Sequence, residues 1–334
     1  MTASHPLLEP IQTLHRRIRR DVLDACDRSA LTALSRVARD DGGDTIFAID
    51  RVADAVLIEE IGRTIATRDA PVALVAEGLA GGEVCVPAGS DISDAKWVII
   101  VDPIDGTRGL MYQKRPAWIL TGVASGPGPR TLADIELAVQ TEIPVVKQHL
   151  SDEIWAVRGQ GAAARRVNIL TGESWALELQ PSTATTIVQG FATVSRFFPG
   201  FRGELGAIDD EVVEAAIGAP QPGKAQSFED QYISSGGQLY ELFAGHDRFV
   251  ADLRPLVERR RTSGAALCCH PYDLCTELIA RELGVSVTDE RGRPLAAALD
   301  VTSNVAWVGY ANGAVRAQIE PHLRRALIRR GLID

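Results

Sequence analysis

Apolar residues at helical spacing predict helices at the start of the chain. They recur every three or four positions from about Leu7 to Val37, with one or two breaks, and again from Asp50 to Ala66, where Asp50 is an expected N-cap. Two short apolar runs then predict strands at Val72–Ala76 and Trp97–Val101. The chain is therefore expected to begin with helices and to continue into a sheet.

A series of strands without intervening helices is predicted for the middle of the chain. Loops separate these strands, and one of them is the Gly- and Pro-rich stretch Ser125–Arg130. Such an order is typical of a meander of mostly antiparallel strands. The expected strands are Ala117–Ala124, Ile135–Thr141, Ile154–Arg158, Arg166–Leu170 and Trp175–Leu179.

Strands alternate with helices after Ser182. The stretch Phe201–Gly223 is rich in Gly and Pro and predicts an irregular insertion. We therefore expect two tightly packed halves, an α+β half over residues 1–181 and an α/β half over residues 182–334. The elements expected in the second half are strand Thr186–Phe191, helix Ser227–Ala244, strand Arg248–Asp252, helix Asp273–Leu283, strand Val301–Tyr310 and helix Ala314–Arg330.

Composition narrows the class of protein. The 334 residues (35.9 kDa) are 46% hydrophobic and 24% charged, as in an ordinary folded chain. No window approaches 18 uninterrupted apolar residues, so we expect no membrane span. No apolar stretch follows the basic cluster at residues 16–20, so we expect no signal peptide. The five cysteines, an odd number, are expected to be reduced thiols in a cytoplasmic protein.

The net charge bears on the partners. Its formal value of −9 argues against tight binding to a nucleic-acid polymer, which usually requires a basic surface. An anionic small molecule would therefore need local positive charge, which bound metal ions can supply.

The string Asp102–Thr107 (DPIDGT) follows the predicted strand Trp97–Val101 directly. Two carboxylates three residues apart converge if the chain turns between them, and Pro103 restricts that turn. The carbonyl of Ile104 would then lie between the two carboxylates. Such hard oxygen donors suit Mg²⁺. The alternative is an ordinary Asx-type turn after a strand, although the complete six-residue string is more specific than that.

The residues after the second aspartate favour phosphate binding. Gly106 permits close approach of the backbone, and the amides of Gly106, Thr107 and Arg108 could face a phosphate oxygen. The guanidinium of Arg108 is a candidate substrate contact, with a surface role as the alternative.

The DPIDGT string resembles, at every position, the first signature of the inositol monophosphatase family, which belongs to the Mg²⁺-dependent, lithium-sensitive sugar and nucleotide phosphatases. Three further segments agree in order and approximate spacing, namely Asp44–Asp50, Val75–Gly78 and Pro271–Asp273. The similarity extends in layout over roughly residues 10–325 but is strong only at these motifs. It implies an α/β fold, a layered αβαβα sandwich, and usually a homodimer.

The resemblance also assigns roles. It implies a shell for two or three Mg²⁺ ions in which Asp105 bridges two ions. The implied metal ligands are Glu77, Asp102, the Ile104 carbonyl, Asp105 and Asp273, and the implied catalytic residues are Asp50, Thr107 and Glu77. Asp50 and Thr107 would bond to each other and orient the attacking water. The implied substrate contacts are Asp105, Gly106, Thr107, Arg108, Ser234, Ser235 and Asp252.

Three positions depart from the family pattern. Phe47 stands where Thr is usual, Gly78 replaces the second Glu of a Gly-Glu-Glu element, and Tyr272 replaces Trp. The change at Gly78 would remove a carboxylate beside an outer metal ion. Together, Phe47 and Gly78 motivate one alternative of another class, a catalytically weak metal-binding or interaction protein on the same fold.

The expected function is hydrolysis of a small phosphate ester, an inositol or sugar monophosphate, by metal-activated water. Fructose 1,6-bisphosphate and 3′-phosphoadenosine 5′-phosphate are alternative substrates. They are kept because the extra segment 253–268 contains Arg259–Arg261, which could reach a second phosphate. A solvated basic loop is the simpler interpretation of those arginines.

Overall fold

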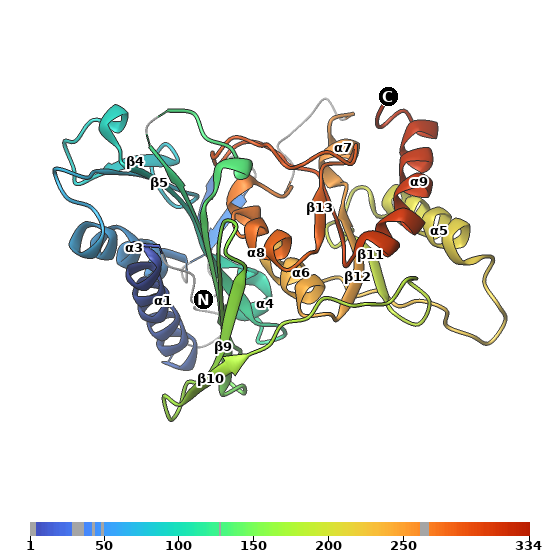
Figure 1. Ribbon diagram of the computed structural model, residues 1–334, viewed down its shortest axis with the longest axis horizontal. Helices are drawn as coiled ribbons and strands as arrows, with labels where there is room; N and C mark the ends of the chain where they lie inside the picture. Colours follow the sequence, from blue (N-terminus) through green and yellow to red (C-terminus); the bar gives the residue numbers. More distant parts are fainter. Residues whose placement is uncertain (1–4, 29–36, 42–43, 48–49, 127, 261–266) are drawn as a thin grey trace.

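The computed structural model describes residues 5–28, 37–41, 44–47, 50–126, 128–260 and 267–334. Helices and sheets are stacked in five alternating layers (Figure 1). The order is helices α1 and α3, an eight-stranded sheet, helices α6 and α8, a four-stranded sheet, and helices α5 and α9. The predicted α/β class and αβαβα sandwich are confirmed.

The eight-stranded sheet has the order β10-β9-β8-β7-β6-β5-β3-β4. Consecutive strands from β5 to β10 pair antiparallel, which confirms the predicted meander, whereas β3 and β5 are parallel. The strands are β3 (Val72–Ala76), β4 (Glu83–Val86), β5 (Trp97–Asp105), β6 (Ala117–Ser125), β7 (Leu137–Ile143), β8 (Leu150–Val157), β9 (Ala162–Asn168) and β10 (Ser174–Leu177).

Helices α1 (Leu8–Arg28) and α3 (Asp50–Thr64) cover one face of this sheet. The apolar stripe of α1 packs against α3 and β7 and is fully buried at Ile11, Leu14, Ile18 and Val22. Helix is confirmed as far as Arg28, and the predicted positions Leu31 and Leu34 lie outside what the structure describes. The expectation of helix at Val37 is wrong, because Val37 begins the strand β1 (Val37–Asp41), which pairs antiparallel with β2 (Asp44–Phe47) before α3.

The other face carries α6 (Ser235–Phe243) and α8 (Glu277–Glu282), which also pack on the four-stranded sheet. That sheet has the order β11-β12-β14-β13, and α5 (Arg202–Ile217) and α9 (Gly313–Arg329) cover its far side. Its strands are β11 (Phe191–Val194), β12 (Asp247–Asp252), β13 (Ser286–Thr288) and β14 (Trp307–Tyr310). The short helical turns are α4 (Thr107–Met111), α7 (Arg254–Glu258), η1 (Ile92–Asp94), η2 (Leu132–Asp134) and η3 (Pro271–Leu274).

The stretch Phe201–Gly223 is not an irregular insertion, because most of it forms α5. Its Gly and Pro residues lie mainly outside the helix, while Leu205, Ile208 and Val212 recur at helical spacing and are buried beside α9. The packing of this apolar stripe therefore determines that the segment is a helix, despite the Gly and Pro residues near its ends.

Several further boundaries differ from prediction. The helix expected at Asp273–Leu283 is Glu277–Glu282, after a short turn that contains Asp273. The strand expected at Thr186–Phe191 begins only at Phe191, and the strand expected from Val301 begins at Trp307. The helix expected from Ser227 begins at Ser235, because Ser234 adopts an extended conformation and caps it. The residues before Ser234 form a loop that leads to the site described below.

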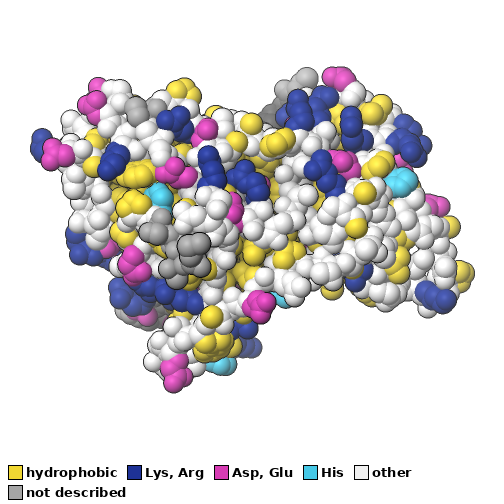
Figure 2. Space-filling model, viewed as in Figure 1, with side chains coloured by type: hydrophobic (Ala, Val, Ile, Leu, Met, Phe, Trp, Pro, Cys, Tyr) yellow, Lys and Arg dark blue, Asp and Glu magenta, His cyan; other side chains and the backbone are white. Residues whose placement is uncertain are grey.

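The surface shows no single dominant sign of charge in the view of Figure 2, where Lys and Arg side chains are interspersed with Asp and Glu. Within the described residues, no helix is both long and apolar enough to cross a membrane.

Candidate metal and phosphate site

A β-bulge brings Asp102 and Asp105 to the same face of the large sheet. Asp102 pairs with Leu120 and Asp105 with Trp118, so three steps along β5 match two steps along β6. Side chains alternate along a strand, and residues three apart would otherwise point to opposite faces. The bulge adds one residue to β5 and so returns the side chain of Asp105 to the face of Asp102. Both carboxylates therefore point into the layer that contains α6 and η3.

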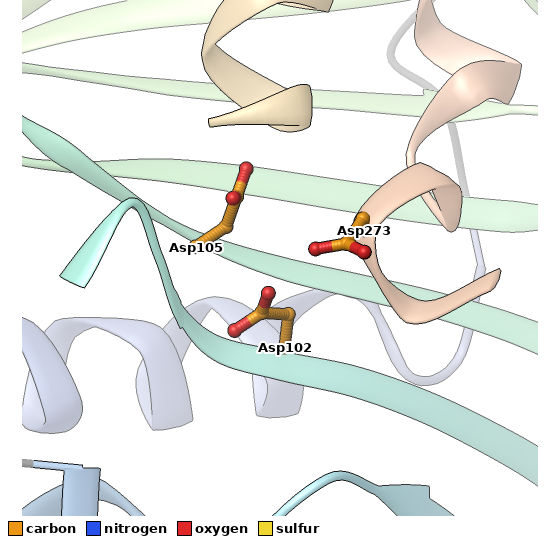
Figure 3. A group of neighbouring side chains, drawn as sticks. All are labelled: Asp102, Asp105 and Asp273. Carbon is orange, nitrogen blue, oxygen red and sulfur yellow. The ribbon is translucent and has the colours of Figure 1, made fainter. Parts of the chain in front are cut away.

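Asp273 joins the two aspartates from the other half of the chain. One carboxylate oxygen each of Asp102, Asp105 and Asp273 lies within 4.8 Å of the others. Figure 3 shows the three side chains, with Asp102 and Asp105 on the end of β5 and Asp273 on a separate helical turn. The turn is η3, and the backbone N–H of His270 donates to Asp273 Oδ2 over 2.6 Å. That bond fixes the carboxylate at the start of the turn.

The first turn of α6 holds Asp105. The hydroxyl of Ser234 donates to Asp105 Oδ2 over 2.8 Å, and the backbone N–H of Gly236 donates over 2.6 Å. A Cβ at Gly236 would lie 2.5 Å from a Leu120 methyl and 2.9 Å from Asp105 Oδ2. Glycine therefore permits the close approach of this helix end to the carboxylate, where the helix dipole favours negative charge.

Backbone geometry positions two more predicted ligands. The hydroxyl of Thr107 donates to the Ile104 carbonyl over 2.8 Å, within the turn that follows the bulge. Glu77 follows β3 directly, and the parallel register pairs Ala76 with Val101. Glu77 therefore emerges at the same end of the sheet as Asp102.

Burial and like charge shape the electrostatics of the aspartates. Burial, and then the carboxylates of Asp105, Asp273 and Glu77, raises the pKa of Asp102 well above its usual range. Burial raises the pKa of Asp105 to about 6, although Ser234 and the amides of α6 favour its charged form. The carboxylates of this cluster repel one another, and a bound cation would relieve that repulsion. Oxygen donors of this kind suit a hard divalent cation such as Mg²⁺.

One cavity of about 110 Å³ brings most of the predicted site residues together. Asp252 does not line it: this residue is fully buried, and its carboxylate is paired with Arg254. The side chains of Asp50 and Phe47 lie outside what the structure describes. The predicted residues that line the cavity are Glu77, Asp102, Ile104, Asp105, Gly106, Thr107, Arg108, Ser234, Ser235 and Asp273, with the departures Gly78 and Tyr272 beside them.

Several lining residues were not predicted. Phe197 and Phe198 lie in the loop after β11, and Arg254 begins α7 after β12. A charged residue two positions after Asp252, at the end of an apolar strand, was the available signal for Arg254. Nothing in the local sequence distinguishes the two phenylalanines.

The fold is shared with solved phosphatase structures, although no protein-family model and no curated protein matches the sequence. The extragenic suppressor protein SuhB from Bartonella henselae is 16% identical, with a TM-score of 0.66 over 96% of this chain and 99% of that one. Fructose-1,6-bisphosphatase from Leishmania major is 13% identical, with a TM-score of 0.67 over 96% and 93%. An IMPase from Thermotoga maritima is 16% identical, with a TM-score of 0.61 over 97% and 99%.

Proposed function

We propose that the protein is a Mg²⁺-dependent phosphomonoesterase that hydrolyses a small phosphate ester. The observation that carries this proposal is the convergence of Asp102, Asp105 and Asp273 in one cavity that the start of α6 also lines. The structurally similar proteins include inositol monophosphatases and fructose-1,6-bisphosphatases, which supports phosphate-ester chemistry on this fold.

Each part of the site has a chemical task in this proposal. Two or three Mg²⁺ ions, when bound, would lower the pKa of a water molecule and neutralise the phosphate. Asp102, Asp105, Asp273, Glu77 and the Ile104 carbonyl would hold them. Thr107, together with Asp50, would orient the attacking water. Ser234, Ser235 and the Gly106–Arg108 segment would contact the ester. Because water is the attacking group, no covalent enzyme intermediate is required.

The leading substrate is an inositol or sugar monophosphate. We also propose a cytoplasmic homodimer that is inhibited by lithium, in line with the family that the motifs resemble. A panel of about a dozen phosphorylated metabolites, assayed with Mg²⁺, with EDTA and with added millimolar Li⁺, would identify the substrate and test the metal dependence together.

Replacing Asp102 or Asp105 by Asn should abolish Mg²⁺-dependent hydrolysis, because each change removes a charged ligand. We expect a loss of at least about 10³-fold in kcat/KM, since metal charge supplies several kcal/mol of transition-state stabilisation. Asp210→Asn is a matched control, because Asp210 is exposed on α5 and does not line the cavity. Near-wild-type turnover in either site variant would contradict the proposal.

A metal-binding protein without significant turnover is the second candidate. Gly78 favours it, because a glycine lines the cavity where the family motif has a carboxylate. Saturable Mg²⁺ binding by calorimetry, without hydrolysis of any ester in the panel, would select this alternative.

A further inference from the structure

A cluster of arginine and phenylalanine side chains lines the same cavity as the aspartates. It consists of Phe197 and Phe198 after β11, Arg254 at the start of α7, and Arg108 in α4. We call these four residues the Arg–Phe wall. The four come from three separate segments, so the fold and not a single loop assembles the wall.

The two rings support the two guanidinium groups. The Arg254 guanidinium lies 4.3 Å from the centre of the Phe197 ring and 5.3 Å from that of Phe198. The Arg108 guanidinium lies 5.4 Å from the centre of the Phe198 ring. Contacts of this kind orient a planar cation through the ring quadrupole. Both rings are therefore in contact with guanidinium groups. This arrangement argues against a stacking surface for a nucleobase.

Hydrogen bonds to Asp252 and to a backbone carbonyl fix the guanidinium of Arg254. Asp252 is fully buried, and its Oδ1 accepts a hydrogen bond from Arg254 Nε over 2.8 Å, while Nη2 also donates to the carboxylate. Arg254 Nη1 donates to the Leu267 carbonyl over 2.7 Å. A guanidinium has five N–H donors. Counted over the described part of the chain, one N–H remains on each of Nη1 and Nη2.

The wall presents two guanidinium groups to the cavity, those of Arg108 and Arg254. Arg254 is paired with Asp252. Arginine donors in a fixed plane match the oxygens of a phosphate or carboxylate better than a neutral hydroxyl. The wall and the three aspartates line the same cavity, so both would face one bound ester.

We propose that the Arg–Phe wall binds a second anionic group, a phosphate or carboxylate, on the alcohol part of the ester. The inference rests on the proposed phosphatase function and narrows its substrate class to doubly anionic esters. It gives Asp252 the task of positioning Arg254 instead of the direct substrate contact that the family resemblance implies. It also assigns recognition of the second anionic group to Arg108 and Arg254 and not to Arg259–Arg261, which the sequence suggested.

Those arginines are placed less well for this task. Arg259 is exposed and does not line the cavity, and Arg260 donates to Glu204 over 3.0 Å. Arg261 lies outside the described residues. Arg254 is therefore the residue to test.

The test compares esters that differ only in the second anionic group. One pair is fructose 1,6-bisphosphate and fructose 1-phosphate, and the other is 3-phosphoglycerate and glycerol 3-phosphate. For at least one pair, we expect the wild-type kcat/KM to favour the doubly anionic ester by roughly tenfold or more, the usual effect of a charge-assisted contact. The pair with the larger preference identifies phosphate or carboxylate as the second group.

The main variant changes both partners of the buried pair, Asp252→Asn with Arg254→Gln, because removing one partner would leave an uncompensated buried charge. We expect the preference to fall to within about threefold of unity. Arg254→Lys, which keeps the charge but loses the fork, should retain part of the preference. Arg259→Gln is the matched control and should retain all of it.

Three results would overturn the inference. The first is a wild-type enzyme that hydrolyses both members of each pair equally well. The second is a double variant that slows both members by the same factor, which would assign the wall to the reacting phosphate. The third is a preference that Arg259→Gln removes and the double variant keeps.

Failure of the proposed function is distinguishable from these results. If the protein hydrolyses no ester, the same pairs can be compared by calorimetric dissociation constants in the presence of Mg²⁺. A preference for the doubly anionic ester that disappears in the double variant would then support the wall although catalysis is absent. Equal dissociation constants would overturn it.

Discussion

The imidazole of His15 is fully buried, and the folded chain favours its neutral form. Its ring lies between α1 and the large sheet, with Nδ1 2.9 Å from the Thr141 hydroxyl and Nε2 2.8 Å from the Thr121 hydroxyl. Burial, and then the charges of Arg19 and Arg16, lowers the pKa of His15 to about 3. In the unfolded chain the ring titrates near its ordinary value of about 6.5.

This difference in pKa predicts acid sensitivity. Below about pH 6.5 the unfolded chain binds a proton that the folded chain excludes, so the free energy of unfolding falls as the pH falls toward 3. At pH 4.5 the contribution of His15 amounts to about 2–3 kcal/mol. Urea unfolding of wild type and His15→Gln between pH 7 and 4.5 measures it, since the gap between the two stabilities should narrow as the pH falls. Parallel curves would show that the ring is not the cause.

At the scale of elements, the start of α6 is both a helix cap and a wall of the site. Ser234 accepts a hydrogen bond from the Gly237 N–H over 2.8 Å and donates to Asp105. One side chain thus links the second half of the chain to the bulge in β5. Its loss should affect stability and metal affinity together.

Ser234→Ala should lower the free energy of unfolding by about 0.5–2 kcal/mol, the usual cost of losing an N-cap. It should also weaken Mg²⁺ binding, because Asp105 loses one of its donors. Asn312→Ala is a matched control: Asn312 caps α9 through the N–H groups of Ala314 and Val315 and does not line the cavity. Calorimetry should show weaker Mg²⁺ binding in the first variant only, and equal affinities would contradict the link.

The elements that the sequence predicts well are those fixed by local pattern. The strands of the meander alternate with loops, and each pairs with its neighbour in the chain, so their order follows from the sequence. Helix α5 was missed because Gly and Pro at its ends suggest a loop, whereas its buried stripe becomes visible only against α9. The start of β11 likewise depends on pairing with β12, a strand more than 50 residues away.

The same distinction applies to the site. Asp102 and Asp105 could be predicted together because one motif contains both and a single strand holds them. Asp273 and Ser234 were placed beside them only by resemblance to a family, since no local pattern joins segments so far apart. Arg254 and the two phenylalanines were not found, because their meeting depends on how α7 and the loop after β11 pack across the layers.

At the scale of the whole molecule, four of the 44 acidic residues gather at the cavity, which two arginines also line. Repulsion among the acidic residues opposes folding when no cation is bound. Cation binding and overall stability should therefore be linked.

Mg²⁺ should raise the melting temperature, because the proposed metal site exists only in the folded chain. At 100 times the dissociation constant the gain is about 2.7 kcal/mol, which corresponds to a few degrees for a chain of this size. NaCl at equal ionic strength should not reproduce it. Asp102→Asn should lose the response and, without metal, should be at least as stable as wild type. A Mg²⁺ response that this variant retains would place the binding elsewhere.

The bond between Asp105 and Gly236 also has a consequence for how the molecule reaches its final state. It joins residues 131 positions apart, and the two chain segments must both be largely ordered before it can form. Contacts of such large sequence separation carry a loop-closure cost that neighbouring strands avoid, so they tend to form late. During refolding, helices and meander strands should accumulate first. The ability to bind metal at the proposed site would then return last, after β5 and the start of α6 have packed together.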